Sequence, residues 1–168
     1  MLETDAGVMV SEISAIAEYL EEIAPAPPII GSSPEERAQT RMWARRLDLE
    51  ICMALGTAFQ AGRARRFFAD RKLLPCEQAA EDYLAIGAAR LGWLEERMGA
   101  NRWVCGERFS WADVPLFAFL EFFGTRGRQE EHYPHDGWLD GWRARMRERP
   151  SVAAALALAP APAAPPGG

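Results

Sequence analysis

The chain lacks a long apolar run, an excess of basic residues and an even set of cysteines. No stretch approaches the roughly 20 apolar residues of a bilayer-spanning helix, and Glu3 and Asp5 stand where a signal peptide would carry positive charge. A net charge of −5 disfavours nucleic acid as the main partner, because phosphate binding requires a basic surface. The three cysteines, Cys52, Cys76 and Cys105, argue against a disulfide framework. These absences predict a cytoplasmic protein with no membrane and no nucleic-acid partner.

What the chain has is helix-forming sequence. Its 168 residues, 49% of them apolar, suffice for one globular domain. Ser33 can cap a helix, Pro34 suits the first helical position, and Glu36 completes a capping box, so a long helix should run to about Gln60. Its buried stripe is predicted to consist of Trp43, Leu47, Ile51, Ala54 and Ala58.

Other segments are assigned by the same spacing. A second long helix is phased by Leu84, Gly87, Leu91, Leu94 and Met98, and a short late helix by Trp138, Trp142 and Met146. Residues 2–4 and 8–10 could pair as a short hairpin around a turn-prone Asp-Ala-Gly. Residues 62–66 are predicted to form a basic loop, and the proline- and alanine-rich residues 157–168 a disordered tail.

The stretch ERFSWADVPLFAFLEFF, residues 107–123, announces a helix most clearly. Ser110 and Asp113 fit a capping box, in which the carboxylate accepts from the Ser110 amide and the serine oxygen accepts from the Asp113 amide. Phe109 and Val114 fit the hydrophobic staple that fixes how the chain enters the helix. Residues 114–123 are apolar on nearly every side, which predicts a central buried helix.

The order of these motifs resembles the cytosolic glutathione S-transferase family, bacterial type. Phe109-Ser110-x-x-Asp113 resembles the family's folding motif, and Glu12-x-x-Ala-Ile-x-x-Tyr-Leu resembles its glutathione-binding region. The resemblance implies an all-α fold, a helical bundle like the C-terminal domain of the family, with a short hairpin and helix as the remnant of a thioredoxin-like domain. The implied boundaries are residues 1–24 for the remnant, 25–33 for the linker, 34–156 for the helical domain and 157–168 for the tail.

The resemblance also implies a site for glutathione at the start of the helix that follows Ser11. In the family, a glutamate at the position of Glu12 binds the ammonium of the γ-glutamyl group of glutathione. Free backbone amides at the start of the helix bind the carboxylate of the same group. The family's serine at the next position is replaced here by Ile13, with Ser11 and Ser14 on either side. The alternative is that Ser11 and Glu12 merely cap a surface helix.

The implied activity is addition of the glutathione thiolate to a small hydrophobic electrophile. The family's catalytic tyrosine, serine or cysteine precedes the region that resembles this chain, so no catalytic residue is assigned, and we expect a truncated chain or a helical domain with another role. Arg45 and Cys52 are expected to face the cleft between the domains; the alternative is a solvated arginine and an inert thiol. A homodimer is implied, and the alternative function is a non-catalytic binding or dimerisation module.

Two other patterns are set aside. His132 and His135 have a spacing that a metal could use, but the proline between them predicts a loop, so no metal site is assigned. Residues 62–74 mix basic and aromatic side chains as some RNA-binding segments do. The acidic chain instead favours a solvated turn between helices, with Phe67 and Phe68 tucked inward.

Overall fold

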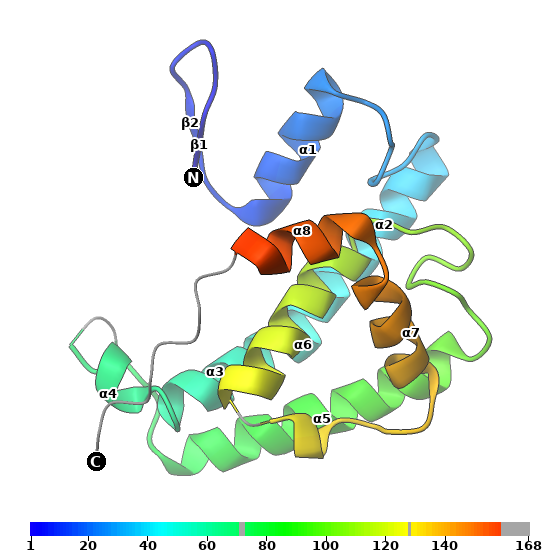
Figure 1. The fold of residues 1–168 in the computed structure, drawn as a ribbon. Helices are drawn as coiled ribbons and strands as arrows, with labels where there is room; N and C mark the ends of the chain where they lie inside the picture. Colours follow the sequence, from blue (N-terminus) through cyan, green and yellow to red (C-terminus); the bar gives the residue numbers. More distant parts are fainter. Residues whose placement is uncertain (71–72, 128, 159–168) are drawn as a thin grey trace.

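The computed structural model describes residues 1–70, 73–127 and 129–158. The segments with capping signals and apolar stripes form a series of helices (Figure 1). A two-stranded antiparallel hairpin comes first, with Leu2 opposite Val10. The elements are β1 Leu2–Glu3, β2 Met9–Val10, α1 Ile13–Ile23, α2 Pro34–Leu47, the π-helical turn η1 Asp48–Cys52, α3 Met53–Ala61, α4 Arg65–Phe68, α5 Gln78–Met98, α6 Asp113–Gly127, the 3₁₀ turn η2 Glu130–His132, α7 Trp138–Arg147 and α8 Pro150–Leu158. The predicted fold class, a helical bundle preceded by a hairpin and a helix, is confirmed. Among the described residues, no helix is long and apolar enough to cross a bilayer.

The first long helix begins as its caps indicate. The Ser33 hydroxyl oxygen accepts a hydrogen bond from the Glu36 amide at 3.2 Å, and the Glu36 carboxylate accepts from the Ser32 amide at 2.7 Å. Backbone dihedrals stay helical through α2, η1 and α3, so one helix continues to Ala61. The sequence pattern did not predict the π-helical turn, residues 48–52, within it.

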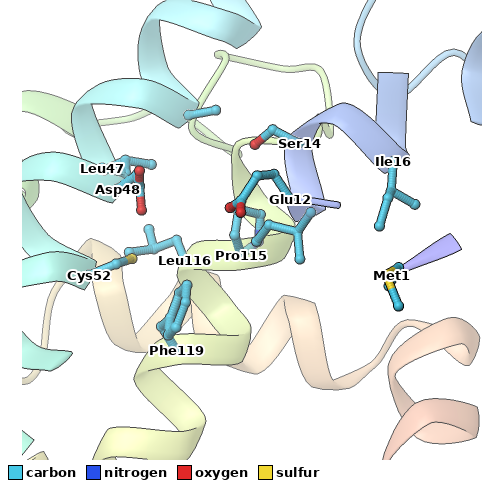
Figure 2. Close-up of a pocket in the computed structure, with 12 residues that line it drawn as sticks. Met1, Glu12, Ser14, Ile16, Leu47, Asp48, Cys52, Pro115, Leu116 and Phe119 are labelled. Atoms are coloured by element: carbon cyan, nitrogen blue, oxygen red, sulfur yellow. The ribbon is translucent and has the colours of Figure 1, made fainter. Parts of the chain in front are cut away.

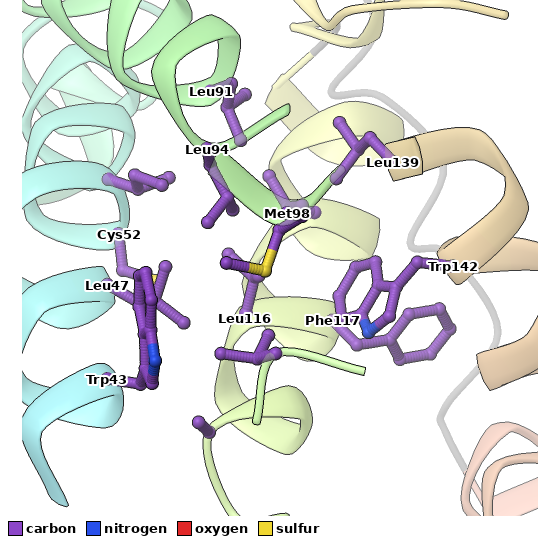
Figure 3. Close-up of a cluster of buried hydrophobic side chains, with 14 of the residues drawn as sticks. Trp43, Leu47, Cys52, Leu91, Leu94, Met98, Leu116, Phe117, Leu139 and Trp142 are labelled. Atoms are coloured by element: carbon purple, nitrogen blue, oxygen red, sulfur yellow. The ribbon is translucent and has the colours of Figure 1, made fainter. Parts of the chain in front are cut away.

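The core forms where the apolar stripes of four helices meet. Figure 3 shows side chains of α2, α5, α6 and α7 converging on one cluster. The predicted stripe of the first long helix is buried throughout, and Leu91 and Leu94 of α5 are fully buried, as are Leu116 and Leu120 of α6. This meeting of stripes fixes α6 between the other helices and so positions the face that lines the candidate site.

Asp113 accepts hydrogen bonds from several parts of the chain at the start of α6. Its Oδ2 accepts from the Ser110 amide at 2.9 Å and from the Ser110 hydroxyl at 3.1 Å. Its Oδ1 accepts from the Val104 amide and from the Trp142 indole, each at 2.9 Å. The predicted role of the serine oxygen was wrong, because the hydroxyl donates to the carboxylate and the Asp113 amide donates to the Ser110 carbonyl instead.

Several local predictions need correction. Residues 65 and 66 of the predicted basic loop belong to the short helix α4. Phe67, in the same helix, is 57% exposed, so it is not tucked inward. The predicted all-round burial of residues 114–123 fails at Phe122, which is 47% exposed because none of the described helices covers that face completely. Residues 157 and 158 of the predicted disordered tail are helical in α8, and the rest of that tail lies outside the described residues.

Two glycines of α5 give a matched test of how closely α3 and α5 pack. A Cβ at Gly87 would lie 2.5 Å from Cδ2 of the fully buried Leu55, whereas a Cβ at Gly92 would meet nothing within 4 Å. Overpacking costs about 1–3 kcal/mol, and replacing glycine within a helix gains about 0.5–1 kcal/mol. We expect Gly87→Ala to lower the free energy of unfolding by about 1–2 kcal/mol and Gly92→Ala to raise it by about 0.5–1 kcal/mol, as measured by urea denaturation. The same sign for both variants would contradict this packing.

Candidate functional site

The chain enters α1 through a strained residue. Glu12, the N-cap of α1, has φ 67° and ψ 124°, in the left-handed region that residues other than glycine rarely adopt. Such a conformation costs about 1 kcal/mol or more and often marks a functional position. No side chain caps α1. Glu12 thus occupies the N-cap position, but neither its side chain nor that of Ser11 makes a capping hydrogen bond.

A cavity of about 410 Å³ opens between the start of α1, the π-helical turn and α6 (Figure 2). Glu12, at the start of α1, and Asp48, in the π-helical turn, lie on opposite sides of this first cavity. Leu116 and Phe119 of α6 line its apolar part. The full lining is Met1, Glu12, Ile13, Ser14, Ile16, Ala44, Leu47, Asp48, Cys52, Pro115, Leu116 and Phe119.

A second cavity, of about 330 Å³, adjoins the first and has more charged side chains in its lining. The two share Glu12, Ser14, Ala44 and Asp48. The remaining residues that line the second cavity are Glu18, Ile30, Thr40, Arg41, Arg45 and Trp111. The pair therefore offers a charged compartment next to an apolar one, with the two carboxylates at their junction.

The structure distributes the sequence-predicted residues between these compartments. Cys52 lines the first cavity and Arg45 the second, where Arg45 donates to the Asp48 carboxylate at 3.3 Å. Glu12 and Ser14 line both cavities, whereas Ser11 lines neither. Sequence reasoning missed Asp48, although it lies three residues after Arg45 and four before Cys52, a spacing that places all three on one helical face.

The Cys52 thiol lines the first cavity but is not a nucleophile. Only 5% of the residue is exposed. Burial, and then the nearby Asp48 carboxylate, raise the pKa of Cys52 to about 12. Since the thiolate is the reactive form, this cysteine stays protonated and unreactive at neutral pH.

Two acids of α1 attach the helix to the rest of the chain. Glu21, 4% exposed, accepts from the backbone amides of Ile30 at 2.6 Å and Gly31 at 3.2 Å. Glu18 forms a two-pronged pair with Arg41 of α2, with N–O distances of 2.9 and 2.7 Å. Arg41 donates to Glu18 and so holds the pKa of that carboxyl below its usual value. The buried Glu21 therefore fastens α1 to residues 30 and 31, and the exposed Glu18–Arg41 pair adds a weaker contact with α2.

The two histidines lie apart from this site. His132 is in η2 with Glu131 at 3.5 Å, and His135 has Asp140 at 3.8 Å. Within residues 1–70, 73–127 and 129–158, no three histidine, cysteine or acidic side chains gather as metal ligands.

Comparison with known proteins identifies relatives of this chain. The model of the family described as "Glutathione S-transferase, C-terminal domain" matches residues 77–158. Glutathione S-transferase 2 of Saccharomyces cerevisiae is 24% identical over 159 residues, which are 90% of this chain and 64% of the yeast protein. The chain thus spans less than two thirds of that relative.

Solved structures agree with the match. A glutathione S-transferase domain-containing protein of Marinobacter aquaeolei is 30% identical, with a TM-score of 0.77. The match covers 90% of this chain and 72% of the Marinobacter chain. A glutathione transferase homologue from Sulfitobacter, solved with bound glutathione, is 24% identical and has a TM-score of 0.68. That match covers 93% of this chain and 80% of the Sulfitobacter chain. With its helical bundle and matched motifs, the chain belongs to the glutathione S-transferase family and carries that family's C-terminal helical domain.

Proposed function

We propose that this chain provides the γ-glutamyl edge of the glutathione site and the hydrophobic co-substrate pocket of a glutathione transferase. The main observation in support is the position of Glu12 and Asp48 at the junction of a charged and an apolar cavity beside the start of α1. The bound glutathione named for the Sulfitobacter homologue supports the choice of ligand.

The charges of the γ-glutamyl group match the groups around the second cavity. Its ammonium would be held by Glu12, with Asp48 facing it across the space. The first helical hydrogen bond of α1 runs from the Ile16 amide to the Glu12 carbonyl, so the amides before Ile16 are outside the helical ladder and can donate to the carboxylate. The Ser14 hydroxyl lines the same cavity and can add one donor.

The apolar compartment suits a small hydrophobic electrophile. Leu47, Leu116 and Phe119 would bury its carbon skeleton, which brings the reacting carbon to the glutathione sulfur. A carbon–sulfur bond then forms as the electrophile accepts the sulfur electron pair, either releasing a leaving group or taking up a proton. We assign activation of the thiol to the family's thioredoxin-like domain, because Cys52 stays protonated.

We further propose that the protein acts as a cytoplasmic homodimer, as the family resemblance implies. The three cysteines are free thiols, one exposed and two buried, which fits a reducing compartment. Analytical ultracentrifugation tests the dimer.

Calorimetric titration of the chain with glutathione tests the proposed site. We expect a dissociation constant below about 1 mM, equivalent to roughly 4 kcal/mol. Glu12→Gln should weaken binding about tenfold, because the ammonium loses a charged partner. Glu22→Gln, an exposed acid of α1 outside both cavities, is the matched control and should bind like the parent.

The Ile13→Ser variant sharpens the test by restoring the family's hydroxyl. Ile13 is 53% exposed at the first position of α1, so the change costs little stability. One added hydrogen bond to a carboxylate should tighten binding by about tenfold. If neither the parent chain nor this variant binds glutathione, the non-catalytic binding or dimerisation module is the better description.

A further inference from the structure

The side chains that line the first cavity carry charge of one sign. Glu12 and Asp48 are its charged side chains, and none of the arginines, lysines or histidines that the structure describes lines it. Figure 2 shows the two carboxylates facing the same space, and Leu116 and Phe119 line the apolar part of that cavity. A small molecule held by the apolar part therefore lies next to negative charge.

The nearby arginines leave most of this charge in place. Arg41 and Arg45 line the second cavity but not the first, and Arg41 is held by both carboxylate oxygens of Glu18, at 2.9 and 2.7 Å. Arg45 lies 3.3 Å from Asp48, but the side chains of this pair are 69% and 57% exposed. Water screens an exposed pair of this kind, so Arg45 offsets the charge of Asp48 only in part.

The π-helical turn fixes where Asp48 stands. The Asp48 amide donates to the carbonyls of Ala44 and Arg45, and the Asp48 carbonyl accepts from the Met53 amide, five residues further on. The backbone therefore holds this residue at the cavity whether or not the ion pair with Arg45 forms. Its charge also reaches the cavity wall, because Asp48 is, after burial, the second cause of the raised pKa of Cys52. Turns of this type are rare and are frequent at functional sites.

Bound glutathione would not cancel the charge of the first cavity. In the proposed function, on which this inference rests, the γ-glutamyl ammonium is held by Glu12, and the free amides of α1 take the γ-glutamyl carboxylate. One ammonium group cannot neutralise both Glu12 and Asp48. The co-substrate would therefore enter a compartment that keeps a negative charge, with Asp48 as the acid that the ammonium does not pair.

We propose that Asp48 selects the co-substrate by charge. The first cavity would accept small apolar electrophiles that are neutral or cationic, and would reject those that carry a carboxylate or a sulfonate. An anionic group would lose part of its water next to a like charge, which costs free energy, whereas a cationic group would be attracted. Discrimination of this kind depends on a repulsive element as well as on apolar contacts. Asp48 is then a specificity-determining residue of the co-substrate pocket.

Three probes that share one ring system and differ in charge test this proposal. They are naphthylmethylammonium, naphthylmethanol and naphthoate, each substituted at the same ring position, and none of them is an electrophile, so calorimetric titration of the full chain measures binding alone. We expect the ammonium to bind at least as tightly as the alcohol, and the carboxylate to bind about tenfold more weakly than the ammonium. High salt should reduce this difference, because it screens the charges.

Two variants should shift the preference in opposite directions. Asp48→Asn should bring the affinities for the ammonium and the carboxylate to within about threefold of each other and leave that for the alcohol unchanged. Arg45→Gln removes the cation beside Asp48 and should widen the difference. Both side chains are more than half exposed, so both variants should fold. Asp82→Asn makes the same chemical change at an exposed acid of α5 outside both cavities, and should leave all three affinities unchanged.

Several results would overturn the proposal. Equal affinities for the three probes in the parent chain would show an apolar pocket without charge selection, and an unchanged preference in Asp48→Asn would assign the selection to another group. Absence of binding for every probe would show that the cavity does not hold an apolar ring. Glutathione is titrated separately. Glutathione binding with equal probe affinities would refute the charge selection alone, whereas the expected order of probes without glutathione binding would refute the glutathione site alone.

Discussion

Replacing Asp113 with alanine is expected to lower the free energy of unfolding by about 4 kcal/mol, near the upper end for single substitutions. The carboxylate is fully buried and accepts from the Val104 amide, the Trp142 indole and two donors of Ser110. Each buried donor left without a partner costs about 1–3 kcal/mol, and water entering the vacated space recovers part of that. Burial raises the pKa of Asp113, which partly offsets the stabilising effect of its hydrogen bonds.

Equilibrium denaturation in urea measures this loss, with Asp82→Ala as the control. Asp82 is an exposed acid of α5, so its removal should change stability by less than about 0.5 kcal/mol. Asp113→Asn should fall between the two, because its oxygen can keep one pair of donors while its amide group faces the other pair. A loss for Asp113→Ala of only about 1 kcal/mol, the usual cost of a helix cap, would mean that Val104 and Trp142 do not depend on it.

Replacing Glu21 with alanine is expected to release α1 without unfolding the helical domain. Glu21 is 4% exposed and accepts from the Ile30 and Gly31 amides, with Arg37 at 3.7 Å. Its loss leaves two backbone donors and a guanidinium without their acceptor, which should lower the free energy of local opening of α1 by about 2–4 kcal/mol. Because Glu12 begins the same helix, glutathione binding should weaken as well.

Hydrogen exchange of residues 13–31 measures this opening, and the melting temperature of the whole chain reports on the core. The matched control is Glu18→Ala, which removes the exposed pair with Arg41. Such surface pairs contribute about 0–1 kcal/mol, so its effect should be small. Faster exchange throughout α5 and α6 in Glu21→Ala would show that α1 and the helical domain unfold together.

The sequence alone indicated the helices that local chemistry specifies. Ser33, Pro34 and Glu36 mark the start of α2, because caps and a fixed proline dihedral act within one turn. The stripes through Leu47, Leu91 and Trp142 indicated which faces are buried, since helical spacing depends only on the order of residues. The family followed from these motifs in their order.

Only the tertiary structure decided what the helices bring together. The π-helical turn places Asp48 across from Glu12, and the fold brings the Trp142 indole to Asp113. It also left one apolar face of α6 open toward α8, where all-round burial had been predicted. Periodicity describes the faces of a single helix. Binding sites and the pairing of buried hydrogen-bond donors depend on the distances between helices, which the packing of the whole core determines.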